Sequence, residues 1–102
     1  MPEERSTTYV APPSLTNRER ASCRDAVLSA VEGAARRGDH VVVVDMLATR
    51  EIDASGLGCL ILLQKRARER GMRTRLSQVS ADIATLLDST RLYTLFEVER
   101  RR

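Results

Sequence analysis

The chain has 102 residues, a length that fits one domain spanning residues 1–102. It is 42% hydrophobic but only 3% aromatic, so its core must consist of aliphatic side chains. The net charge of +3 rests on arginine, since all but one of the 17 basic residues are arginines, interspersed with glutamate. No aromatic residues stand beside them to stack on bases, and no nucleic-acid module is recognisable. Direct nucleic-acid binding is therefore not expected.

Membrane insertion and secretion are not expected either. No apolar run approaches the ~20 residues that a membrane span requires, and no apolar segment follows a basic start at the N-terminus. Cys23 and Cys59 are too few for a disulfide scaffold and lack metal-ligand spacing, so both are predicted to be reduced thiols in the core of a cytoplasmic protein. Residues 1–6 and 100–102 are expected to fray.

The first predicted elements are a strand and a helix. Residues 7–11 read as a short strand, which a Pro-Pro pair terminates. Residues 14–39 have a helical period. Their apolar stripe contains Cys23, Val27, Val31 and Ala34. Thr16 or Asn17 can cap the start of this helix, and Gly38 can end it.

In the rest of the chain, predicted strands and helices continue to alternate. Residues 40–46 are a β-branched run without alternation, which predicts a strand buried on both faces in a parallel sheet. A helix over residues 54–70 follows, then an alternating strand over 73–79. A short helix over residues 80–90 and an edge-like strand within 92–99 complete the chain. This order predicts an α/β sandwich built from right-handed crossovers.

The helix at residues 54–70 looks apolar on two sides, because residues 59–63 are all apolar. On a helical wheel, the face expected to pack on the sheet contains Leu57, Leu60, Ile61, Gln64 and Ala67. The opposite face contains Ser55, Gly58, Leu62, Lys65, Arg66 and Glu69. Leu62 would then project into water beside a residue without a side chain. A hollow next to an exposed leucine suits a docking surface, although a single exposed leucine needs no explanation.

Asp53 precedes the first turn of this helix, where a carboxylate can cap free N–H groups. The same position can receive a phosphate. Asp45 ends the preceding strand and is expected near Asp53 in a parallel sheet. These carboxylates and Ser55 lack a third hard ligand nearby in sequence, and the one histidine, His40, lies at the wrong end of its strand. We therefore predict no catalytic residue, no metal and no cofactor.

Together these segments resemble the STAS domain found in bacterial anti-sigma factor antagonists. The resemblance covers roughly residues 15–99. It rests on a hydrophobic strand ending in Asp45, seven further residues, and the motif DASGLG at residues 53–58 opening a helix. It implies a small mixed, mostly parallel sheet with helices packed on it. The opening hairpin looks shortened, which leaves a sheet edge able to pair with a second copy.

The resemblance also implies a function. In such proteins the motif's helix docks on an anti-sigma factor that is also a serine kinase, and phosphorylation at the helix start blocks docking. We therefore expect a non-enzymatic regulator of transcription that binds an anti-sigma factor or another kinase-like ATPase-fold protein. The expected binding residues are Asp53, Ala54, Ser55, Gly56, Gly58, Leu62 and Lys65. The alternative is a scaffold subunit of a stress-signalling or lipid-transport ATPase assembly.

The chain departs from the family pattern at several positions. The family's phosphoacceptor directly follows the motif's aspartate, but here that residue is Ala54, which has no hydroxyl. Either Ser55 accepts the phosphate in a shifted register, or the domain cannot be switched in this way, and we favour the second. Glu51 stands where an apolar residue is usual, and Arg91 replaces the glycine expected before Leu92.

Overall fold

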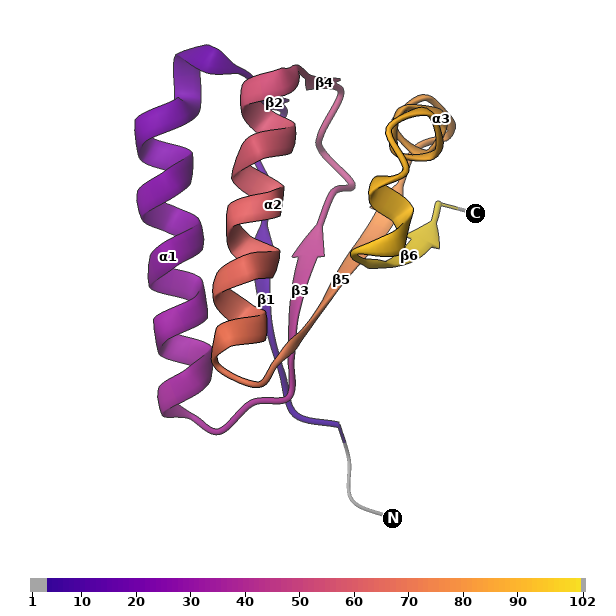
Figure 1. Ribbon diagram of the computed structural model, residues 1–102. Coiled ribbons are helices and arrows are strands. Elements are labelled where there is room, and N and C mark those ends of the chain that lie inside the picture. The colour runs from indigo at the N-terminus through magenta and orange to yellow at the C-terminus, as the bar shows by residue number, and fades with distance from the viewer. Residues whose placement is uncertain (1–3, 102) are drawn as a thin grey trace.

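The predicted strands and helices occur in the predicted order in the computed structural model, which describes residues 4–101 and adds two short strands that were not predicted (Figure 1). The strands are β1 (Ser6–Val10), β2 (Ser14–Leu15), β3 (Val41–Asp45), β4 (Glu51–Ile52), β5 (Arg73–Val79) and β6 (Glu97–Arg100). The α-helices are α1 (Arg20–Arg36), α2 (Ala54–Glu69) and α3 (Ala81–Ser89). The short 3-10 helices are η1 (Asn17–Glu19) and η2 (Leu92–Thr94). The predicted α/β fold is confirmed.

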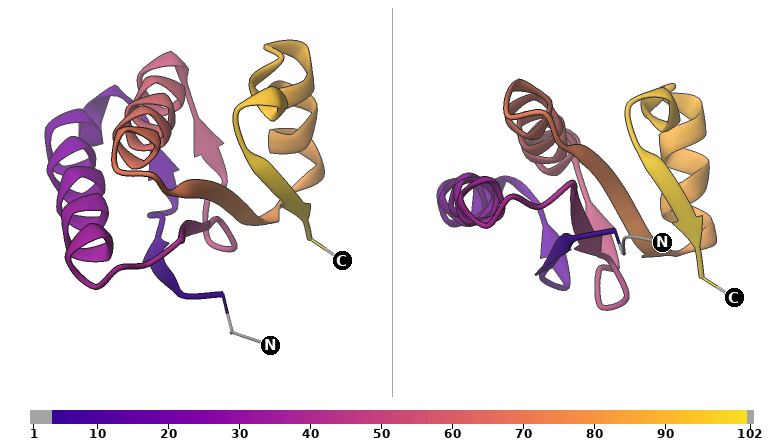
Figure 2. Two further views of the ribbon diagram at one scale, coloured as in Figure 1. Left: turned by 60° about the horizontal axis from the view of Figure 1, so that its bottom comes forward. Right: turned by 90° about the horizontal axis from the view of Figure 1, so that it is seen from below.

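The main sheet has four strands in the order β1-β3-β5-β6, and every pairing in it is parallel. Helices connect successive strands, as the crossover rule requires. Figure 2 shows α1 and α2 side by side along the sheet, with α3 at the other end beside β6. β1 pairs only with β3, so the edge predicted to be bare lies along β1.

One hydrophobic core joins the sheet to all three α-helices. The predicted stripe of α1 is confirmed, because Cys23, Val27, Val31 and Ala34 are all buried. From α3 the core takes Ile83, Ala84 and Leu87. Val42 and Val44 of β3 face these helices, with Leu76 and Val79 of β5. Aliphatic side chains dominate, as the composition requires.

The predicted wheel of α2 is partly wrong. Its buried residues are Gly56, Cys59, Leu60, Leu63 and Ala67. Ile61 is instead 37% exposed, and Leu62 packs partly against the core. The reason is that α1 lies against one flank of α2, so this helix buries two adjoining faces. Five consecutive apolar residues supply both faces without revealing the phase of the helix.

The reverse face of the sheet carries charges. Arg73 and Arg75 of β5 form ion pairs with Glu4 and Glu97, and Arg75 also pairs with Glu99. Fraying was predicted for residues 1–6 and 100–102. Ser6 lies in β1 and Arg100 lies in β6, while residues 1–3 and 102 lie outside the described part.

Two unusual backbone positions match features of the sequence. Arg91, which stands where the family pattern has glycine, adopts a left-handed conformation with φ of 59°. Such a conformation favours glycine because it has no Cβ. Gly71, just after α2, has φ of 76°, which suits its predicted role of ending that helix.

Candidate partner-binding site at the start of helix α2

The carboxylate of Asp53 joins the starts of two helices. Its Oδ1 accepts a hydrogen bond from the backbone N–H of Gly56 at 3.0 Å, which caps α2 as predicted. Its Oδ2 accepts one from the backbone N–H of Asn17, the first residue of η1, also at 3.0 Å. These hydrogen bonds, the one from Gly56 foremost, lower the pKa of the Asp53 carboxyl below its ordinary value. The sequence could not predict the link to Asn17, which is distant in the chain.

A close backbone approach fixes the position of the α2 start. A Cβ atom added to Gly56 would lie 2.0 Å from the carbonyl oxygen of Leu15. That oxygen accepts a hydrogen bond from the backbone N–H of Asp53 at 3.2 Å. β2 and β4 pair in parallel directly beside this contact, with Leu15 opposite Ile52. Gly56 is therefore required because only glycine admits the β2 backbone at this distance.

Ala54 and Ser55 differ in how they face the solvent. Ala54, at the phosphoacceptor-equivalent position, is exposed. Ser55 is half-buried, and its hydroxyl donates a hydrogen bond to the side-chain oxygen of Asn17 at 3.3 Å. The only hydroxyl of the motif is thus turned toward η1 and is already hydrogen-bonded.

A hollow of about 340 Å³ lies between α1 and α2, one turn beyond the capped start of α2. It is lined by Arg20, Arg24, Ser55, Gly58, Cys59 and Leu62. A Cβ atom added to Gly58 would meet nothing within 4 Å, so the missing side chain leaves open space. Lys65 is exposed two turns further along α2 and does not line the hollow. The predicted hollow beside Gly58 and Leu62 therefore exists, although Leu62 forms part of its wall rather than projecting from the helix.

The two arginines were not among the predicted site residues. Arg20 and Arg24 lie one turn apart at the start of α1, and both are exposed. Positive charge at a helix N-terminus opposes the helix dipole, and like charges four residues apart repel each other. The sequence alone therefore shows that these two positive charges are unfavourable for the helix, and this was the available signal that they belong to a site.

Asp45, which was expected to lie near Asp53, has a backbone hydrogen-bond partner of its own. Asp45 accepts a hydrogen bond from the backbone N–H of Leu47 at 2.9 Å. Within residues 4–101, no group of three or more His, Cys, Asp or Glu residues could hold a metal ion. Nor does any helix in this part of the chain have the length and apolarity to cross a membrane.

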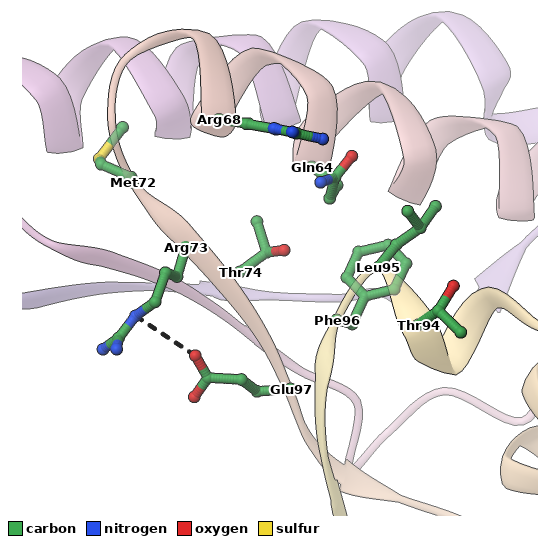
Figure 3. A pocket seen from close by; sticks show the side chains of 9 residues that line it. All are labelled: Gln64, Arg68, Met72, Arg73, Thr74, Thr94, Leu95, Phe96 and Glu97. Carbon is green, nitrogen blue, oxygen red and sulfur yellow. Dashed lines mark ion pairs between the residues drawn. The ribbon is translucent and has the colours of Figure 1, made fainter.

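A second hollow, of about 400 Å³, opens on the other flank of α2 (Figure 3). Its lining residues are Gln64, Arg68, Met72, Arg73, Thr74, Thr94, Leu95, Phe96 and Glu97. Arg73 and Glu97 form an ion pair at 3.3 Å across its lower edge. None of these residues belongs to the predicted binding set. The hollow between α1 and α2 remains the candidate site.

One family of known proteins matches most of the chain. A family model described as "Mlab, STAS domain" covers residues 14–97. No curated protein matches the sequence.

Several solved structures are similar to this chain in fold, and three of them illustrate the range. An anti-sigma-factor antagonist (STAS) domain protein from Planctomyces limnophilus has a TM-score of 0.81 at 20% identity, over 98% of this chain and 86% of that chain. A sulfate transporter family protein from Wolinella succinogenes has a TM-score of 0.77 at 20% identity, over 94% and 77%. The phosphorylated form of the Bacillus cell fate determinant SpoIIAA has a TM-score of 0.63 at 14% identity, over 96% and 86%.

Proposed function

The chain belongs to the STAS domain family, and we propose that it is a regulatory protein–protein interaction module, an anti-sigma factor antagonist. Its proposed partner is an anti-sigma factor or a related kinase-like protein with an ATPase fold. The proposed action is binding rather than catalysis, in the cytoplasm of a bacterium, with regulation of transcription as the result.

The observation that carries this proposal is the open hollow beside Gly58. It lies next to the exposed Ala54 at the capped start of α2, so one partner surface can cover both. A hollow with an apolar wall and a charged rim suits the anchoring side chain of a partner. Leu62 supplies apolar wall, while Arg20 and Arg24 supply positive charge.

We further propose that the antagonist is locked in its binding form. Ala54 cannot carry a phosphate, and the Ser55 hydroxyl is turned toward Asn17. The charge of Asp53 would also repel a phosphate group placed on Ser55. A domain that cannot be phosphorylated at the start of α2 keeps its docking surface available.

Gly58→Gln is the variant that best tests the docking surface. The added side chain would fill the open space beside Leu62 without touching the core. The helix itself should tolerate or favour the change, because glycine costs roughly 1 kcal/mol relative to alanine inside a helix. Leu62→Glu is a poorer test, since Leu62 packs partly against the core and its loss would also destabilise the fold.

The measurement is calorimetric binding to the anti-sigma factor or kinase-like protein that a pull-down with the wild-type chain recovers from the native cytosol. We expect Gly58→Gln to weaken binding by about 30-fold or more, as for a hot spot of ~2 kcal/mol, with an equal or higher melting temperature. Ser29→Gln is the matched control, because Ser29 is exposed on α1 away from its buried stripe. Unchanged affinity for Gly58→Gln, or an equal loss for Ser29→Gln, would contradict the proposal.

Ala54 also favours a second candidate function within the same family. A fixed scaffold subunit of a stress-signalling or lipid-transport ATPase assembly needs no phosphoacceptor. A co-purifying ATPase in a constant ratio, with affinity unaffected by Gly58→Gln, would favour this alternative over the antagonist.

A further inference from the structure

Two thiols from different helices meet where α1 packs against α2. The Sγ atoms of Cys23 and Cys59 are 2.9 Å apart, and both cysteines are free. Both residues are buried, with 5% and 8% of their surface exposed. The hydroxyl of Tyr9 in β1 lies 3.9 Å from the Cys23 sulfur. These contacts make a polar group of three side chains within a mostly aliphatic core.

We propose that Cys23 and Cys59 are a redox pair that closes to an intramolecular disulfide when the protein meets a hydroperoxide, and that a small thiol reopens it. A disulfide bond is about 2.0 Å long, so the two sulfur atoms, now 2.9 Å apart, must approach by roughly 1 Å. α1 and α2 already lie side by side, so neither helix has to change its place in the fold.

Cys23 is the attacking group. The Cys59 thiol donates a hydrogen bond to the Cys23 sulfur, and this contact, together with that of Tyr9, lowers the pKa of Cys23 to about 7 despite its burial. The same contact raises the pKa of Cys59. A thiolate is the reactive form of cysteine, so the pair holds one nucleophile and one protonated partner.

The chemistry balances in two steps. The Cys23 thiolate attacks one oxygen of the hydroperoxide, the O–O bond breaks, and the departing oxygen leaves as water or an alcohol after taking up a proton. The Cys59 thiol then loses its proton and attacks the sulfenic sulfur, which expels water and forms the S–S bond. Both electrons that reduce the peroxide come from the two thiols. Two equivalents of a small thiol reverse the change and are themselves oxidised to a disulfide.

A small oxidant would reach the pair from the side of Cys59, whose sulfur is in contact with that of Cys23. Cys59 lines the hollow between α1 and α2, beside Gly58 and Leu62. The bond would link the walls of that hollow, because Cys23 lies on α1 and Cys59 on α2. This inference concerns the thiols alone and stands whether or not the proposed partner is correct.

The test is intact-mass analysis of the folded, reduced full chain after treatment with about one equivalent of hydrogen peroxide. We expect a mass loss of two hydrogen atoms, simultaneous loss of both thiols, and a proteolytic fragment in which Cys23 is linked to Cys59. Dithiothreitol should restore the starting mass. In the Cys59→Ala control the reaction should stop at a Cys23 sulfenic acid, seen as a mass gain of one oxygen and trapped by dimedone. In the Cys23→Ala control Cys59 should react much more slowly.

Three results would overturn the proposal. One is a gain of oxygen on the wild-type protein without the loss of two hydrogens. Another is disulfide-linked dimers in place of the internal bond. The third is reaction only after a denaturant has unfolded the chain.

Discussion

Asp53 shows how a single carboxylate can hold two helix starts together. Its hydrogen bonds from Gly56 and Asn17 lower its pKa in the folded state, below the value of about 3.9 for an unfolded aspartate. A carboxyl with a depressed folded pKa stabilises the protein above the unfolded pKa. That contribution is lost as the pH falls through the folded pKa.

We therefore expect Asp53→Ala to lower the melting temperature by several degrees at pH 7 and by clearly less at pH 3. Thermal melts across this range, compared with wild type at each pH, measure the difference. Asp25→Ala removes an exposed carboxylate from α1 and is the control, with little effect expected at either pH. A pH-independent difference for Asp53→Ala would mean that its charge does not matter.

Ala54 is the residue on which the proposed locked state depends. We expect no phosphate on the wild-type protein after incubation with its cognate kinase and ATP, and one phosphate on an Ala54→Ser variant. The reason is that residue 54 is exposed at the helix start, whereas the Ser55 hydroxyl donates to Asn17. Intact-mass measurement reads the result. A phosphate on wild type, mapped to Ser55, would restore the ordinary regulated antagonist, and an unmodified Ala54→Ser variant would favour the scaffold function.

At the scale of elements, α2 has a core face that differs from the one predicted. Leu60 is 1% exposed and Ile61 is 37% exposed, although both were expected to face the sheet. Leu60→Ala should cost on the order of 2–5 kcal/mol because it leaves a cavity, and Ile61→Ala should cost less than about 1 kcal/mol. Denaturant titration of both variants gives the comparison. Equal losses would mean that α2 is rotated from the orientation described.

The sequence predicts the elements that carry a local signal, which is either a repeating pattern of apolar residues or a capping residue. The β-branched run of β3, the stripe of α1 and the cap at Asp53 all carry such local signals. β2 and β4 were missed because strands of two residues show no period. The contacts of Asp53 with Asn17 and of Cys23 with Cys59 were missed because each joins residues far apart in the chain.

At the scale of the whole molecule, β1 has no partner strand on its outer edge among residues 4–101, the part of the chain that the structure describes. Val10 in this strand is 64% exposed, and an exposed strand edge can pair with a second copy of itself. We expect sedimentation equilibrium to show a monomer–dimer equilibrium. A Val10→Lys variant should shift it to monomer, because a charge on the strand edge opposes pairing.

Leu47→Lys is the control for added charge at an exposed apolar residue. Leu47 is 57% exposed, but it lies in the loop after β3 rather than on the edge strand. Dimers that persist in Val10→Lys, or a wild type that remains monomeric at high concentration, would show that the β1 edge is not an interface.

The strand order has a consequence for how the protein is made. The strands lie across the main sheet in the order in which the ribosome delivers them, β1, β3, β5 and then β6. Each newly synthesised strand can add to the edge of the strands already made, and none has to be inserted between two others. Each new pair of strands then encloses only one strand-helix-strand unit of the chain, so the entropy cost of bringing the two strands together stays small. A nascent chain can therefore fold progressively from its N-terminus during synthesis.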